Sequence, residues 1–151
     1  MALPASPARL APVLWLLLFA FLLRVAGQML VAFWGVDWLP PMDAWMSGLL
    51  PYPYLLVSQF LINGLFAKIA ADFTRGKGWF VEPRPIFGRG VLYFGRIYFA
   101  AMVVRYVVRM SLFPEERWLG GTIPIFFHFV LAAFLILFGL WHKQNLKENP
   151  V

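Results

Sequence analysis

The stretch PVLWLLLFAFLLRVAGQMLVAFWGV, residues 12–36, decides the fold class of this chain. Arg24 and Gln28 are its only strongly polar residues. A helix rises about 1.5 Å per residue, so this stretch is long enough to cross a hydrocarbon core of roughly 30 Å. Three further apolar stretches follow, at about residues 52–71, 89–112 and 123–142. The sequence therefore predicts an all-α integral membrane protein, a single transmembrane domain over residues 1–151 that forms a four-helix transmembrane bundle.

The composition supports this class. The chain is 62% hydrophobic and 13% charged, and its mean hydropathy is +0.74, which is too apolar for the surface of a soluble domain. A membrane β-barrel would show alternating segments of about 10 residues, whereas these stretches are continuous. The sequence has no cysteine, which excludes disulfides, thiolate metal sites and iron–sulfur clusters. No basic helix face lies outside the predicted spans, so nucleic acid is not an expected partner.

The charges between the predicted spans indicate the orientation. Eight basic residues fall on one side: Arg9, Lys68, Arg75, Lys77, Arg84, Arg89, Lys143 and Lys147. The other side carries two basic residues beside four acids: Arg109, Arg117, Asp37, Asp43, Glu115 and Glu116. Because cytoplasmic loops are enriched in lysine and arginine, we expect both termini and the basic loop at residues 74–88 to be cytoplasmic. The expected location is the cell inner (plasma) membrane.

Polar side chains of the four predicted helices fall at similar depths. About 8–12 Å below the outer surface, each helix contributes one polar residue, in order Gln28, Gln59, Arg105 and His128. A second level, Arg24 and Asn63, lies roughly 16–18 Å deep. Arg24 and Gln28 are one turn apart, as are Gln59 and Asn63, so each pair shares a helix face. The sequence therefore predicts a polar layer in the outer half of the bundle.

This layer is the candidate site. It combines donors, acceptors and one imidazole, which suits an anionic or carbonyl-bearing amphiphile such as a quinone, a lipid head or a cofactor substituent. No acid falls inside a predicted span, so Arg24 and Arg105 are expected to meet a ligand, a lipid headgroup or another subunit. The alternative is a set of interhelical hydrogen bonds, each contributing about 0.6 kcal/mol to bundle stability.

Arg96 differs from these residues. It lies about 10 Å from the cytoplasmic end of its span, on the face of Arg89 and opposite that of Arg105. Its side chain can extend toward lipid phosphates, and Asp72 is the nearest acid expected from the sequence. We therefore expect Arg96 to contact lipid headgroups or a neighbouring protein.

The histidines restrict cofactor chemistry. His128 and His142 are the only two, and they are separated by about 21 Å along one predicted helix, so they cannot ligate the same haem iron. His128 alone remains a candidate single ligand for a tetrapyrrole, and the phenylalanines around it would also suit a carotenoid; the alternative for His128 is a hydrogen bond within the bundle. No paired carboxylates, catalytic triad, phosphate loop or metal-ligand spacing is present in the predicted spans.

Two functions follow as hypotheses. The first is a non-catalytic accessory or structural subunit of a larger inner-membrane complex, with membrane lipids and other integral membrane subunits as partners. Its basis is the arginines on more than one face together with short soluble loops. The second is a binder of, or an enzyme for, a lipophilic ligand (quinone, lipid, or pigment or haem) that uses the polar layer.

Overall fold

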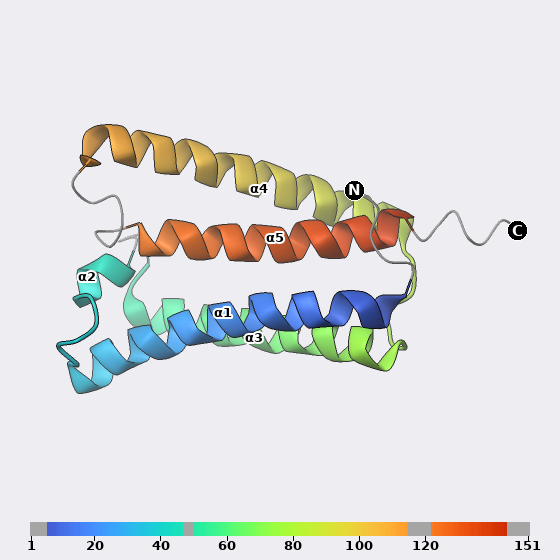
Figure 1. The fold of residues 1–151 in the computed structure, drawn as a ribbon, viewed down its shortest axis with the longest axis horizontal. Helices are drawn as coiled ribbons and strands as arrows, with labels where there is room; N and C mark the ends of the chain where they lie inside the picture. Colours follow the sequence, from blue (N-terminus) through green and yellow to red (C-terminus); the bar gives the residue numbers. More distant parts are fainter. Residues whose placement is uncertain (1–5, 47–49, 115–121, 145–151) are drawn as a thin grey trace, which may run out of the picture.

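The computed structural model describes residues 6–46, 50–114 and 122–144, and every regular element in these ranges is a helix (Figure 1). The elements are α1 (Pro7–Trp34), α2 (Met42–Trp45), α3 (Tyr52–Arg75), α4 (Pro85–Leu112) and α5 (Ile123–Gln144). The four long helices are long and apolar enough to cross a membrane, which confirms an all-helical, multi-pass membrane protein. Glu115, Glu116, Arg117 and Lys147, which entered the prediction of orientation, lie outside the described residues.

The helices extend beyond the predicted spans. α1 begins at Pro7, five residues before the predicted start, and α4 begins at Pro85 rather than at residue 89. Proline is favourable in a first turn because the amide it lacks would have no helical acceptor there. α3 continues to Arg75 and ends at Gly76, whose φ of 64° is a left-handed conformation that suits glycine. The prediction of a loop at residues 74–88 is therefore wrong at both ends, and the connection covers residues 76–84.

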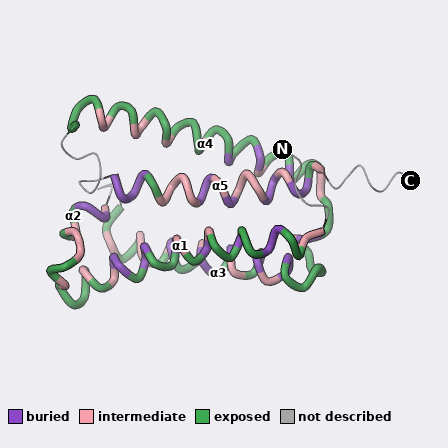
Figure 2. Tube along the Cα trace, viewed as in Figure 1, coloured by how far each residue is buried: buried purple, intermediate pink, exposed green. Residues whose placement is uncertain are grey.

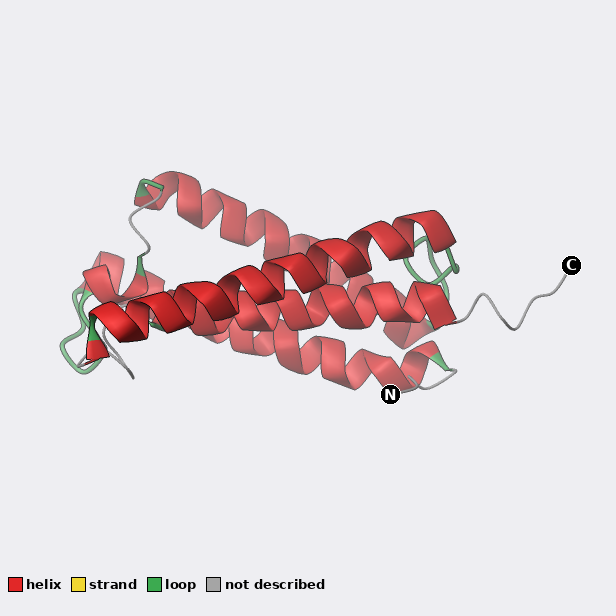
Figure 3. Cartoon of the chain, turned by 90° about the horizontal axis from the view of Figure 1, so that it is seen from above, coloured by secondary structure: helices red, strands yellow, loops and turns green. Residues whose placement is uncertain are grey.

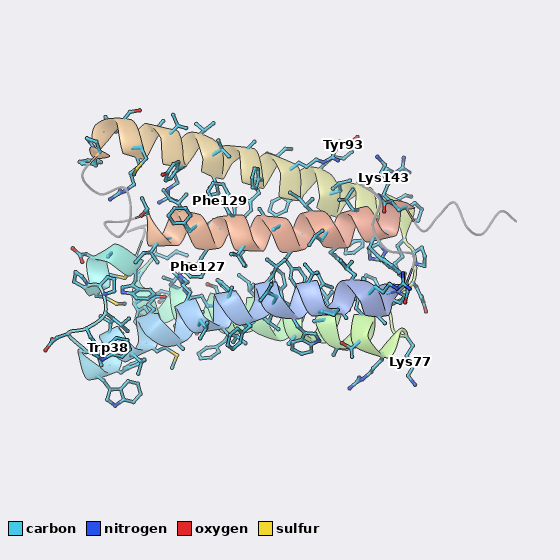
Figure 4. The ribbon with its side chains drawn as sticks, viewed as in Figure 1. Trp38, Lys77, Tyr93, Phe127, Phe129 and Lys143 are labelled. Atoms are coloured by element: carbon cyan, nitrogen blue, oxygen red, sulfur yellow. The ribbon has the colours of Figure 1, made fainter. Side chains whose placement is uncertain are left out.

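The long helices run up and down, and two ends of the molecule can be distinguished in Figures 1 and 3. α2 lies at one end, called here the α2 end, where α1 and α4 finish and α3 and α5 begin. The 76–84 connection lies at the opposite end, called here the loop end, and Lys77 and Lys143 both lie there (Figure 4). The main helix contacts are α1 with α3, α4 with α5, and α1 with α5.

Aromatic side chains of α3 and α5 form much of the core. Phe66 and Phe134 stack with ring centroids 3.8 Å apart, and Phe73 meets the rings of Phe138 and Trp141 at 6.0 and 5.2 Å. Lipid tails are as apolar as these side chains, so this core is stabilised by close packing rather than by exclusion of water. The face of α1 that completes it carries small and aliphatic residues: Leu10, Ala11, Leu14 and Leu18.

α4 is the outermost helix, and α5 is the element it mainly contacts. Its buried residues are Gly88, Leu92 and Gly95, all in its first half, and Figure 2 shows the rest of the helix largely exposed or half-buried. The contact with α5 is close: a Cβ added to Gly139 would come within 2.7 Å of the backbone nitrogen of Leu92. The four-helix bundle therefore consists of a core formed by α1, α3 and α5, and α4 packs on the α5 side of that core.

Candidate functional site

Arg24 lies at the centre of a buried hydrogen-bond network. Its side chain is on the buried face of α1, and Nη1 donates to Oε1 of Gln28 at 3.0 Å. Nη2 donates to the backbone carbonyl of Trp45 at 2.8 Å. Arg24 therefore has two intramolecular partners, and neither of them is a carboxylate. A carbonyl oxygen at the end of α2, where helical carbonyls carry partial negative charge, and an amide oxygen take the place of a carboxylate.

The single turn α2 supplies that carbonyl because it folds back onto α1. The indole ring of Trp45 lies against Gly27, where an added Cβ would come within 2.7 Å of the ring. The indole Nε1 donates to the carbonyl of Pro40 at 2.8 Å, which fixes the ring in this position. Arg24 thus holds the connection between α1 and α3 against the membrane-spanning part of the protein.

α3 joins the network through Gln59. Its Nε2 donates to Oε1 of Gln28 at 3.0 Å, so one amide oxygen receives hydrogen bonds from both α1 and α3. Asn63 shares the face of Gln59, as its spacing predicts, but its Nδ2 donates to the backbone carbonyl of Gln59 at 2.8 Å. Arg24, Gln28, Gln59 and Asn63 are all buried, so the structure brings these four predicted site residues together.

His128 faces the same region from α5, and its partner is a residue that the sequence analysis missed. Nδ1 of His128 hydrogen-bonds with the hydroxyl of Tyr98, on α4. Arg105, which was predicted to lie in this layer, is two turns further along the same face of α4 and lines a surface groove with Val104, Val108 and other residues at the α2 end. Among the described residues, Arg105 makes none of the hydrogen bonds that join Arg24, Gln28 and Gln59.

A cavity of about 250 Å³ lies between these groups. Its polar lining residues are Arg24, Ser58, Gln59, Tyr98 and His128, and its apolar ones are Phe21, Leu50, Leu55, Ile62, Pro124, Phe127 and Leu131. Figure 4 shows Phe127 pointing from α5 toward α1, whereas Phe129 points toward α4. The Phe127 ring centroid is 5.9 Å from the guanidinium carbon of Arg24, which gives the cation an aromatic neighbour.

Several buried polar atoms of the Arg24–Gln28–Gln59–Asn63 network have no hydrogen-bond partner among the described residues. They include Nε of Arg24, Nε2 of Gln28, Oε1 of Gln59 and Oδ1 of Asn63. An unsatisfied buried polar atom costs about 1–3 kcal/mol, so a concentration of four in one network requires an explanation. Hydrogen bonds that stabilise the bundle explain the bonded polar atoms of the network, but they do not explain why these four atoms are buried without partners.

The remaining predicted residues lie elsewhere. Arg96 is exposed on α4 and hydrogen-bonds with no described residue. Asp72, its expected neighbour, instead pairs with Lys68 one turn earlier in α3. Because α3 continues past the predicted span, Asp72 is a buried acid inside a spanning helix, contrary to the expectation that these helices contain none.

His142 lies in the last turn of α5. Its side chain is fully buried at the loop end, where Nδ1 accepts a hydrogen bond from the backbone N–H of Arg84 at 3.2 Å. The ring lies edge-on to Phe138, with centroids 4.6 Å apart.

The chemistry available in the cavity lining is hydrogen bonding beside the positive charge of Arg24. Among the described residues, no group of three or more histidine, cysteine, aspartate or glutamate side chains is placed to hold a metal ion. One nitrogen of His128 is engaged by Tyr98, which leaves Nε2 for a ligand atom. No family model, no curated protein and no solved structure matches this chain, so the geometry of the cavity carries the functional argument.

Proposed function

We propose that this membrane protein binds the polar head of a lipophilic small molecule in the cavity between α1, α3, α4 and α5. The observation that carries the proposal is the lining itself. The polar lining residues Arg24, Ser58, Gln59, Tyr98 and His128 face a space whose other lining residues are apolar. A pocket with a few convergent polar groups in apolar walls is the usual form of a small-molecule site.

The size of the cavity indicates which part of a ligand it holds. Drug-sized ligands occupy pockets of roughly 300–1,000 Å³, whereas this cavity measures about 250 Å³. It therefore accommodates a head group, while an alkyl or isoprenoid tail would lie along the apolar surfaces of the helices. Such a molecule would reach the site from the bilayer, where it is most concentrated.

Mass spectrometry of the protein purified in mild detergent tests this proposal. Ile62 lines the cavity, whereas its neighbour Leu61 is 71% exposed on the surface of α3. Ile62→Phe fills cavity space, and Leu61→Phe is the matched control that adds an aromatic ring outside it. We expect one lipophilic molecule in near-stoichiometric amount with wild type and Leu61→Phe, and its loss from Ile62→Phe. The same lipid content in all three proteins would refute the proposal.

The orientation in the membrane is part of the proposal. Arg75, Lys77, Arg84 and Lys143 all lie at or near the loop end, and Asp37 and Asp43 lie at the α2 end. The excess of basic residues at cytoplasmic membrane surfaces supports a cytoplasmic loop end in a plasma or inner membrane. The cavity would then open in the outer half of the bilayer.

A second function, as an accessory subunit of a larger membrane complex, is favoured by α4. This helix is exposed along most of its length, and Arg96 projects from it with no hydrogen-bond partner among the described residues. A subunit with acidic or polar groups at that depth would satisfy the arginine. Co-purification of a larger complex that Arg96→Leu weakens, while Tyr93→Phe on the same helix does not, would support this function.

A further inference from the structure

The cavity is lined by a buried cation whose charge no described carboxylate balances. Arg24 is only 7% exposed, so its side chain is almost entirely enclosed by the protein. Its two hydrogen-bond partners, the amide oxygen of Gln28 and the backbone carbonyl of Trp45, are both neutral. An opposite charge stabilises a buried ion more than neutral dipoles do, so a counter-ion is expected close to Arg24.

The carboxylates that the structure describes all lie elsewhere. None of them lines the cavity, and they are Asp37, Asp43, Asp72 and Glu82. The last two form ion pairs with basic residues of their own, and the first two are exposed near the α2 end. Among the described residues, the charge of Arg24 is therefore left for a bound molecule to balance.

The guanidinium of Arg24 keeps N–H groups for such a molecule. Of the N–H groups on its two terminal nitrogens, Gln28 takes one on Nη1 and Trp45 takes one on Nη2. The second N–H group of each terminal nitrogen has no acceptor among the described residues. Nε is enclosed by protein atoms and is not needed for this role. Because Arg24 lines the cavity, its remaining terminal N–H groups can donate to the oxygens of a carboxylate or phosphate.

The α4–α5 side of the cavity adds a donor and no negative charge. The hydroxyl of Tyr98 and Nδ1 of His128 share a hydrogen bond. A phenol is the better donor to a neutral imidazole, which leaves the ring proton on Nε2 to donate to an oxygen of the occupant. The other polar lining residues, Ser58 and Gln59, are uncharged. The lining therefore offers hydrogen-bond donors together with a net positive charge.

Resting on the proposed function, we infer that the polar head of the ligand is an oxygen-bearing anion, either the carboxylate of a fatty acid or a lipid phosphate. Its charge balances that of Arg24. Its oxygens accept hydrogen bonds from the remaining terminal N–H groups of Arg24 and from Nε2 of His128. The contacts of Arg24 with Gln28 and Trp45 stay in place, so α2 does not need to move. A neutral head group would leave the charge of Arg24 unbalanced.

The test compares three probes with the same tail: dodecanoate, dodecyl phosphate and the neutral dodecanamide. Binding to the full-length protein in a non-ionic detergent is measured by equilibrium dialysis at mildly alkaline pH, where the carboxylate is ionised. Ile62→Phe supplies the background, because it keeps every basic residue of the loop end. Hydrogen bonds to an ionised group are roughly twice as strong as neutral ones, so at least one anion should bind about tenfold more tightly than dodecanamide. The tighter of the two anions distinguishes a fatty acid from a lipid phosphate.

Removal of the charge adds a second readout. Arg24→Gln keeps an amide donor at this position but removes the charge, so we expect the preference for the anion over dodecanamide to disappear. Arg89→Gln is the matched control, because Arg89 is exposed near the start of α4 and does not line the cavity, so this variant should keep the preference. The comparison of the three probes on wild type does not depend on the folding of either variant.

Three outcomes would overturn the inference and leave the proposed function standing. They are binding of dodecanamide at least as tight as that of both anions, an anion preference that Arg24→Gln retains, and the same loss of preference in Arg24→Gln and Arg89→Gln. If no probe binds wild type above the Ile62→Phe background, the proposed function fails as well.

Discussion

The substitution Gln28→Leu tests the buried network most sharply. Oε1 of Gln28 accepts from Nη1 of Arg24 and from Nε2 of Gln59, both at 3.0 Å. A hydrogen bond to a charged group contributes about 1.5–3 kcal/mol, and an interhelical amide bond in a membrane contributes about 0.6 kcal/mol. The change also removes the unsatisfied Nε2 of Gln28, which offsets about 1 kcal/mol of this lost stability. We therefore expect Gln28→Leu to lower the free energy of unfolding by about 1–2.5 kcal/mol.

Gln59→Leu is the matched control. It removes only the neutral bond and at the same time eliminates the unsatisfied Oε1 of Gln59, so its effect on the free energy of unfolding should be near zero. Both variants are measured by reversible unfolding in mixed micelles with increasing SDS, followed by far-ultraviolet circular dichroism. The reasoning is refuted if Gln28→Leu is as stable as wild type, or if Gln59→Leu is the more destabilising change.

Two further predictions concern packing and orientation. Gly139→Ala should destabilise the protein by about 1–3 kcal/mol, because the added Cβ meets the backbone of α4. The control Gly90→Ala has open space around its Cβ and should be neutral or slightly stabilising. Thermal unfolding compares the two variants, and equal melting temperatures would contradict the packing of α4 on α5. Because the sequence has no cysteine, single cysteines report topology cleanly: in intact cells a membrane-impermeant maleimide should label Asp37→Cys but not Lys77→Cys, and the reverse pattern would overturn the proposed orientation.

The helices were predictable because length and apolar composition alone decide whether a segment can span a bilayer. Their ends were less predictable. The polar sequence after residue 74 resembles a loop, but a helix continues until a residue such as Gly76 ends it, and the next begins where Pro85 permits. The outlying position of α4 depends on close contacts between glycines and the facing helix, which apolar patterning does not reveal.

The candidate site was predicted in part. Helical spacing was sufficient to place Arg24 with Gln28 on one face, and similar depths placed Gln59 and His128 near them. The partner of Arg24 was missed because a backbone carbonyl carries no sequence signal, and its position depends on α2 folding back onto Gly27. Tyr98 was missed because tyrosine was not counted as a polar group of the layer, although it lies on the same face of α4 as the predicted residue.

Photolabelling tests the central claim, that the cavity holds the head of a lipophilic ligand, most directly. A dodecanoate that carries a diazirine beside its carboxylate is activated on the purified protein, and the labelled peptides are mapped by mass spectrometry. The account predicts labels at cavity residues of α3 and α5, such as Ile62 and Leu131, that unmodified dodecanoate prevents. Labels confined to the exposed face of α4, around Tyr93 and Ile97, or labels that excess dodecanoate does not reduce, would contradict it.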